Sequence, residues 1–133
     1  RFYQDWNHGK ARNLLTFMEL QEEVTVKSLS KGMRARLKIV LALARDAELV
    51  LLDEPLSGID PPSRTRIVEA IISQYRVGAQ TLVLSTHEIL ETEGIFDEVV
   101  FLHQGKVALQ GNADSLRSQR GKSLRALFEE VCR

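Results

Sequence analysis

Four aliphatic residues that run directly into two adjacent carboxylates constrain this chain more than any other feature. The segment is LVLLDEP at 49–55, and its acids are Asp53 and Glu54. A short apolar run that ends in a turn signal is typical of a strand buried on both faces of a parallel sheet. We therefore expect an α/β fold in which both acids emerge at the carboxyl end of a strand, where open α/β sheets bind ligands.

A second strand is predicted to end beside the first. Residues 81–85, TLVLS, lead into a Thr-His pair that ends at His87, and an Asp-Pro pair at Asp60 between the strands is typical of a helix start. A strand–helix–strand unit places parallel strands in one sheet, so that their carboxyl ends share an edge. We therefore expect His87 to lie near Asp53 and Glu54, a pair suited to holding a metal ion's water shell and accepting a proton.

Another helix start has the composition of an anion site. Ser30 is placed as the N-cap of a helix with a glycine in its first turn. Free backbone N–H groups and the helix dipole favour anions at such a terminus, although capping alone also explains an isolated Ser-x-Gly. Apolar residues at helical spacing predict one buried side for this helix, and they are Met33, Leu37, Val40, Leu41 and Ala44.

Bulk composition is that of an ordinary globular domain. The chain has 133 residues, and its 18 basic residues balance 18 acidic ones, so overall charge favours neither a nucleic-acid nor a membrane partner. The single cysteine, Cys132, excludes an internal disulfide and a cysteine-rich zinc site. Because the first residue is Arg1 rather than methionine, we expect the chain to be part of a longer protein.

The remaining segments predict a hairpin and short helices but no phosphate-binding P-loop. After the second strand we expect a short acidic helix over 88–94, a hairpin of 99–103 with 106–110, and helices from Ala113 and from Ser123. A P-loop needs a glycine five residues before its Gly-Lys-Ser ending. The Gly-Lys-Ser that ends at Ser123 fails because that position is Leu116, so we predict a turn between helices there.

Taken in order, these segments resemble the later half of an ABC-type ATP-binding domain. The chain's LSKGM resembles the family signature LSGGQ, its LVLLDEP the Walker B strand, its SGID with the following proline the D-loop, and its STH the switch histidine. FLHQGKVALQG resembles the closing hairpin, so the match covers roughly Asp5 to Gly111. The aromatic residues at the start of the chain, Phe2, Tyr3 and Trp6, and the segment LSKGMR are most similar to ATP-binding subunits of bacterial exporters whose membrane subunit is a separate chain.

The resemblance implies a partial P-loop NTPase-type (ABC ATPase) fold, with parallel strands, flanking helices, and a C-terminal β-hairpin and helices. In this organisation residues 1–45 are part of the helical subdomain, residues 46–111 are the later half of the ATPase core, and residues 112–133 are C-terminal helices. The family's P-loop would lie upstream of this stretch.

The resemblance also implies roles for single residues, with ATP and Mg²⁺ as cofactors. Asp53 would orient the Mg²⁺ through its water shell, Glu54 would polarise the attacking water, and His87 would contact the γ-phosphate. Asp60 would couple two sites across a dimer. The nucleotide held by the partner subunit would meet the signature residues, which are Ser30, Lys31, Gly32 and Met33. Lys31 and Met33 depart from the usual Gly and Gln, and we expect Lys31 to face solvent.

The expected partners are a second ATP-binding subunit and a transmembrane permease subunit, with no nucleic acid, on the cytoplasmic face of the cell membrane. The chain alone is expected to be inactive. Two alternatives remain at this point. One is an ATPase head of the DNA-repair or chromosome type, although no sustained heptads are present. The other is a non-catalytic fragment that only mediates association, which fits the missing P-loop.

Overall fold

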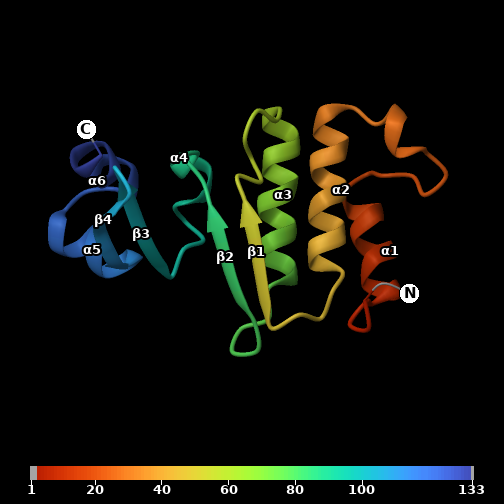
Figure 1. Cartoon of the computed structure of the whole chain (residues 1–133), viewed down its shortest axis with the longest axis horizontal. Coiled ribbons are helices and arrows are strands. Elements are labelled where there is room, and N and C mark those ends of the chain that lie inside the picture. The colour runs from red at the N-terminus through yellow and green to blue at the C-terminus, as the bar shows by residue number, and fades with distance from the viewer. Residues whose placement is uncertain (1–2, 133) are drawn as a thin grey trace. The chain divides into compact units, whose positions relative to one another are not determined.

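The computed structural model describes residues 3–132, which form two compact units, 3–87 and 88–132. The first unit contains α1 (His8–Phe17), the short 3-10 helix η1 (Val26–Ser28), α2 (Lys31–Leu43), β1 (Leu49–Asp53), α3 (Pro61–Gln74) and β2 (Thr81–Ser85). The second contains α4 (Ile89–Thr92), β3 (Glu98–His103), β4 (Lys106–Asn112), α5 (Ala113–Arg120) and α6 (Leu124–Val131) (Figure 1). The predicted three-part domain division stays a prediction.

The predicted strand–helix–strand unit is present in the first unit. β1 and β2 pair in parallel, in a register that places Leu49 opposite Thr81 and Asp53 opposite Ser85, and α3 connects them. Figure 1 shows both strands pointing toward the end of this unit at which α2 and α3 begin. The carboxyl ends of the strands and the amino ends of two helices therefore share one side of the unit.

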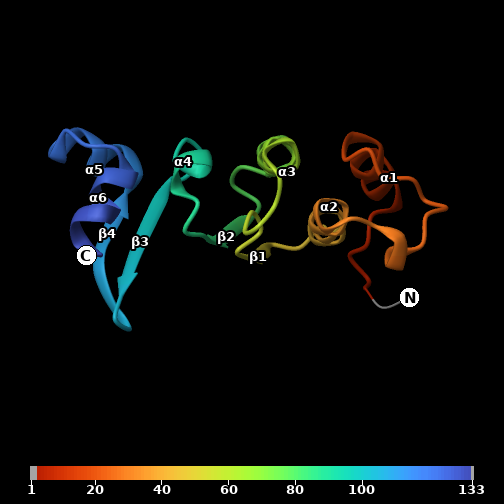
Figure 2. The same cartoon turned by 90° about the horizontal axis from the view of Figure 1, so that it is seen from above.

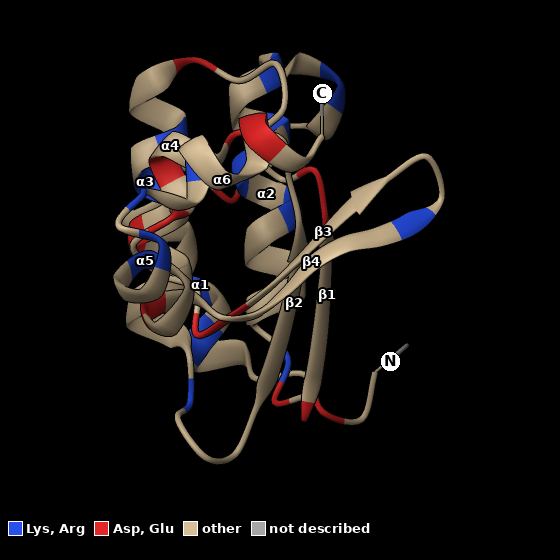
Figure 3. Cartoon of the chain, turned by 90° about the vertical axis from the view of Figure 1, so that its left-hand side faces the viewer, with Lys and Arg blue, Asp and Glu red and all other residues tan. Residues whose placement is uncertain are grey.

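The expectation that β1 is buried on both faces is wrong. Val50 and Leu52 are buried, whereas Leu49 is 54% exposed and Leu51 67% exposed. Val83 of β2, on the same face, is 52% exposed. Figure 2 shows α3 over one face of the strand pair. No element within residues 3–87 covers the opposite face. Figure 3 shows no charged residue along either strand before Asp53, the last residue of β1, so the bare face is apolar around Leu49, Leu51 and Val83.

Local signals determine where the helices of the first unit begin. The side chains of Asn7, Ser30 and Asp60 each accept a hydrogen bond from a backbone N–H in the first turn of α1, α2 and α3, respectively. Such caps satisfy donors that have no partner within the helix. The predicted buried side of α2 is confirmed for Val40 and Ala44, but Leu41 is 50% exposed because it lies on the opposite side from Ile39 and Leu43.

Two arginines fix the end of α1 against the other helices of its unit. Arg36 of α2 donates to the carbonyl oxygen of Met18 at 2.6 Å, and Arg66 of α3 donates to that of Phe17 at 3.0 Å. Arg66 also pairs with the Glu19 carboxylate at 2.6 Å. The last carbonyl groups of a helix lack partners within it, so these bonds attach α1 to both neighbouring helices.

The second unit is built around the predicted hairpin. β3 and β4 are antiparallel, and Gln104 and Gly105 have positive φ values of 49° and 74° in the turn. Gly121 adopts the left-handed conformation after α5, and Ser123 caps α6, which confirms a turn between helices at 121–123. The ring centroids of Phe101 and Phe128 lie 5.6 Å apart, edge to face, within the core of this unit.

Within residues 3–132, no helix combines the length and apolar composition that crossing a bilayer requires.

Candidate functional site

The hydroxyl of Ser85 fixes both carboxylate residues at the end of β1. Ser85 lies opposite Asp53 in the strand register, and its Oγ donates to Asp53 Oδ1 at 2.5 Å. The backbone N–H of Glu54 donates to Ser85 Oγ at 3.0 Å. The Asp53 carboxylate therefore has a fixed orientation, and the chain leaves the strand at Glu54 in a defined direction.

The structure brings Glu54 and His87 into direct contact. His87 Nδ1 lies 2.9 Å from one carboxylate oxygen of Glu54 and 2.8 Å from the other. Glu54 has a φ of +45°, which a residue with a Cβ adopts at some energetic cost. That conformation turns the side chain off the strand toward the end of β2. A carboxylate held against an imidazole can accept a proton from a bound water while the ring holds the carboxylate in place.

Ser30 caps α2 as predicted. Its Oγ accepts from the N–H of Met33 at 3.1 Å, while Lys31 and Gly32 form the start of the helix. Gly32 is buried and Lys31 is exposed, as expected for the lysine. The Lys31 side chain nevertheless covers the turn before α3, because a Cβ added to Gly58 would lie 2.4 Å from Lys31 Nζ.

Asp60 lies between the starts of α2 and α3. Its Oδ2 accepts from the N–H of Ser63 at 3.0 Å, while its Oδ1 would be 2.5 Å from a Cβ added to Gly32. The backbone hydrogen bond from Ser63 holds the pKa of Asp60 below its usual range, with further lowering by the Ser63 hydroxyl and by the positive charge of Arg36.

The lowered pKa of Asp60 predicts a specific pH dependence of folding. A carboxyl group with a lower pKa in the folded chain stabilises it above the unfolded value of 3.8, and this contribution disappears as pH falls through the folded pKa. We expect the difference in melting temperature between wild type and Asp60→Asn to be constant near neutral pH and to shrink below 3.8. Thermal unfolding across pH measures it, and a difference that does not depend on pH would contradict the assignment.

The donors at the end of β1 fit a magnesium ion that is held mainly through water and phosphate. Mg²⁺ in phosphate sites usually takes only one or two protein carboxylates, and waters and substrate oxygens complete its shell. Asp53 supplies one carboxylate beside the Ser85 hydroxyl. No group of three or more His, Cys, Asp or Glu side chains suited to a metal ion occurs among residues 3–132, so a cage made only of protein ligands is not formed there.

Comparisons of the sequence and fold with known proteins identify the family of this chain. A family model described as an AAA domain, putative AbiEii toxin, Type IV TA system, matches residues 10–93. The chain is 38% identical to the Nod factor export ATP-binding protein I of Neorhizobium galegae over 78% of its length and 30% of that protein's. It is 34% identical to the energy-coupling factor transporter ATP-binding protein EcfA2 of Bacillus subtilis, over 80% of this chain and 40% of the relative.

A solved structure agrees with these relatives. It is an ATP-binding subunit of an ABC transporter, with a TM-score of 0.80 and 29% identity, and the match covers 98% of this chain and 56% of that one. The chain belongs to the ABC ATPase family. This confirms the predicted resemblance and the P-loop NTPase-type fold. The chain spans between 30% and 40% of the length of these two curated relatives.

Sequence reasoning assigned no structural role to three residues that shape the site of this ABC ATPase chain. Ser85 orients Asp53, Ser63 holds Asp60, and Gly58 makes room for Lys31. The strand register alone would have indicated Ser85, because it is the residue paired with Asp53. The other two depend on how α2 packs against the start of α3, which spacing along the sequence does not specify.

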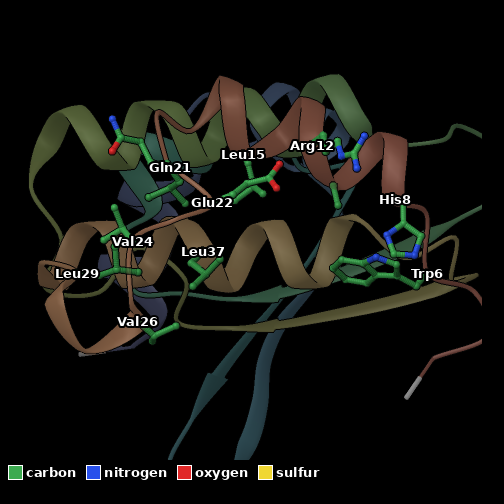
Figure 4. A pocket seen from close by; sticks show the side chains of 12 residues that line it. Trp6, His8, Arg12, Leu15, Gln21, Glu22, Val24, Val26, Leu29 and Leu37 are labelled. Atoms are coloured by element: carbon green, nitrogen blue, oxygen red, sulfur yellow. The ribbon is translucent and has the colours of Figure 1, made fainter. Parts of the chain in front are cut away.

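A groove of about 380 Å³ lies between α1 and α2 of this ABC ATPase chain. Its walls come from α1, from the segment that follows α1, and from α2. Figure 4 shows Leu15 and Leu37 between the two helices, with Trp6 and His8 at one end and Val26 at the other. None of the predicted site residues lines this groove.

Proposed function

We propose that this chain supplies the signature segment, the catalytic carboxylates and the switch histidine of an ATP-hydrolysing ABC transporter subunit. The observation that carries the proposal is the contact between Glu54 and His87 at the shared edge of two parallel strands, beside Asp53. The names of the relatives, which describe ATP-binding proteins of Nod factor export and of an energy-coupling factor transporter, support it. A P-loop from outside the 133 residues would complete the site.

Each residue at the strand edge then has a chemical task. ATP with Mg²⁺ supplies the phosphoryl group and the cation that neutralises it. Asp53, which accepts a hydrogen bond from Ser85, would orient the ion through its water shell. Glu54 would accept the proton of the attacking water, and His87, which contacts Glu54, would also face the γ-phosphate. Catalysis of this kind depends mainly on positioning and on charge.

The start of α2 would act on the nucleotide of a second ATP-binding subunit. Ser30, Gly32 and Met33 present the helix N-terminus, and Lys31 adds a positive charge beside it. Asp60, at the junction with α3, would couple the two sites of the dimer. We propose that a transmembrane permease subunit takes up the resulting motion on the cytoplasmic face of the membrane, and that no nucleic acid takes part.

The proposal can be tested by supplying the missing half. The purified 133-residue chain should release no phosphate from ATP above background, because its sequence contains no P-loop motif to wrap the β- and γ-phosphates. Fusion to the P-loop half of a close relative should produce phosphate release that depends on Mg²⁺. Release by the chain alone, lost in Glu54→Gln, would overturn the predicted inactivity. A folded fusion that binds ATP but never hydrolyses it would overturn the proposed function.

A further inference from the structure

Gly32 lies in the first turn of α2, directly against the Asp60 side chain. We propose that Gly32 positions Asp60, so that the start of α2 and the loop before α3 move as one body. The effect of this contact on ATP turnover rests on the proposed function, which it deepens. The packing itself can be tested without ATP.

The space above Gly32 is filled by two oxygen atoms. A Cβ there would lie 2.5 Å from Asp60 Oδ1 and 2.9 Å from Ser63 Oγ, distances that real Cβ atoms essentially never show. Asp60 cannot rotate away freely, because its other oxygen accepts from the N–H of Ser63. Ser63 is only 4% exposed, so its hydroxyl has little room to move. A Cβ at 32 therefore requires the side chains of Asp60 and Ser63 to shift, and we expect this shift to weaken the Asp60 cap.

Gly9 provides a comparison for Gly32, because both glycines are helical and only the space around them differs. Gly9 is the second residue of α1, as Gly32 is of α2. A Cβ on Gly9 would meet only Asn7 Oδ1, at an ordinary 3.6 Å. Gly32 is helical, and alanine is intrinsically favoured over glycine in helices. Packing against Asp60 is thus the feature that requires glycine at 32.

This contact joins two parts of the proposed site within one chain. Ser30 and Gly32 would face the nucleotide of one site, and Asp60 would face the other. Because the Asp60 carboxylate rests on Gly32 and caps α3, a shift of the α2 start displaces Asp60 as well. Events at the two nucleotides would therefore be linked through a single packed glycine.

The test uses nuclear magnetic resonance and thermal unfolding of the 133-residue chain. In wild type, we expect a nuclear Overhauser contact between the Gly32 Hα and Ser63 Hβ protons. In Gly32→Ala, the carboxyl titration of Asp60 should move up toward 3.8. Relative to Gly9→Ala, which has the same intrinsic gain in helix propensity, Gly32→Ala should lower the folding equilibrium constant about fivefold, which corresponds to the loss of one N-cap. Gly9→Ala, the matched control, should leave the Asp60 titration unchanged.

A double-mutant cycle separates positioning from general damage. Serine at 60 still caps a helix but lacks the oxygen that lies over Gly32. Gly32→Ala should therefore cost less in an Asp60→Ser background than in wild type. An equal cost in both backgrounds, an unmoved Asp60 titration, or no Overhauser contact in wild type would each overturn the proposal. None of these measurements uses ATP, so they test the contact between Gly32 and Asp60 independently of the proposed function. If they confirm the contact but the P-loop fusion does not hydrolyse ATP, only the proposed function is refuted.

Discussion

Replacing Glu54 by Gln should lower ATP turnover by about 10²–10⁴-fold in a protein that also carries the P-loop. The amide keeps the size of the side chain, and with it the contact distance to His87, but it cannot accept a proton from water. ATP binding should stay within a few-fold of wild type, because Glu54 is placed to act on the water rather than on the nucleotide. Phosphate release under saturating ATP and equilibrium nucleotide binding, measured on the same preparation, give the two quantities.

A second carboxylate on the same segment provides the control for this substitution. Glu48 is exposed and lies just before β1, at the amino end of the strand, opposite to Glu54. Glu48→Gln removes the same charge and should leave turnover unchanged. If turnover in Glu54→Gln stays within a few-fold of wild type, Glu54 is not the proton acceptor and the proposed role of the strand edge fails.

The second large effect concerns the bare face of the strand pair. Leu49, Leu51 and Val83 are each more than half exposed on it, and exposed apolar patches of this kind favour association. We expect the 133-residue chain to self-associate through this face and through the edge of β2 that pairs with no other strand within residues 3–132. Leu51→Glu should raise the dissociation constant about tenfold or more, since it places a charge where a leucine would be buried. Sedimentation over a range of concentrations measures the change.

Val77→Glu is the control for self-association. Val77 is 87% exposed in the turn before β2, so this variant adds the same charge at an apolar position outside the strand face. Its dissociation constant should match that of wild type. A wild-type chain that sediments as a monomer at every concentration and unfolds cooperatively would show that the bare face does not drive association.

The sequence predicted the parts of the site that follow from topology. An uninterrupted apolar run and an Asp-Pro helix start were enough to predict β1, α3 and β2 in order. Parallel pairing then required His87 and Glu54 to share an edge, and the structure places them 2.9 Å apart. Helix caps were equally predictable, because capping depends on a side chain and an N–H only three residues apart, as in Ser30 with Met33.

The parts that could not be predicted depend on contacts between elements that are distant in sequence. An apolar strand such as β1 has the same composition whether one or both faces are covered, so the exposure of Leu51 has no local signal. Gly32 and Asp60 are 28 positions apart in the sequence, and their contact follows only from the angle at which α2 meets α3. Lys31 was expected to face solvent, yet its ammonium group also lies over Gly58.

The register between β1 and β2 has a consequence for insertions and deletions. Asp53 reaches Ser85, and Glu54 reaches His87, only because Leu49 is paired with Thr81. A residue added to the turn at 76–79 lengthens a surface connection and leaves that pairing in place. A residue added between Thr81 and Ser85 moves every later side chain to the opposite face and carries His87 beyond Glu54. Natural length variation in this segment should therefore be confined to the turn, with the five paired positions of β2 kept at constant length.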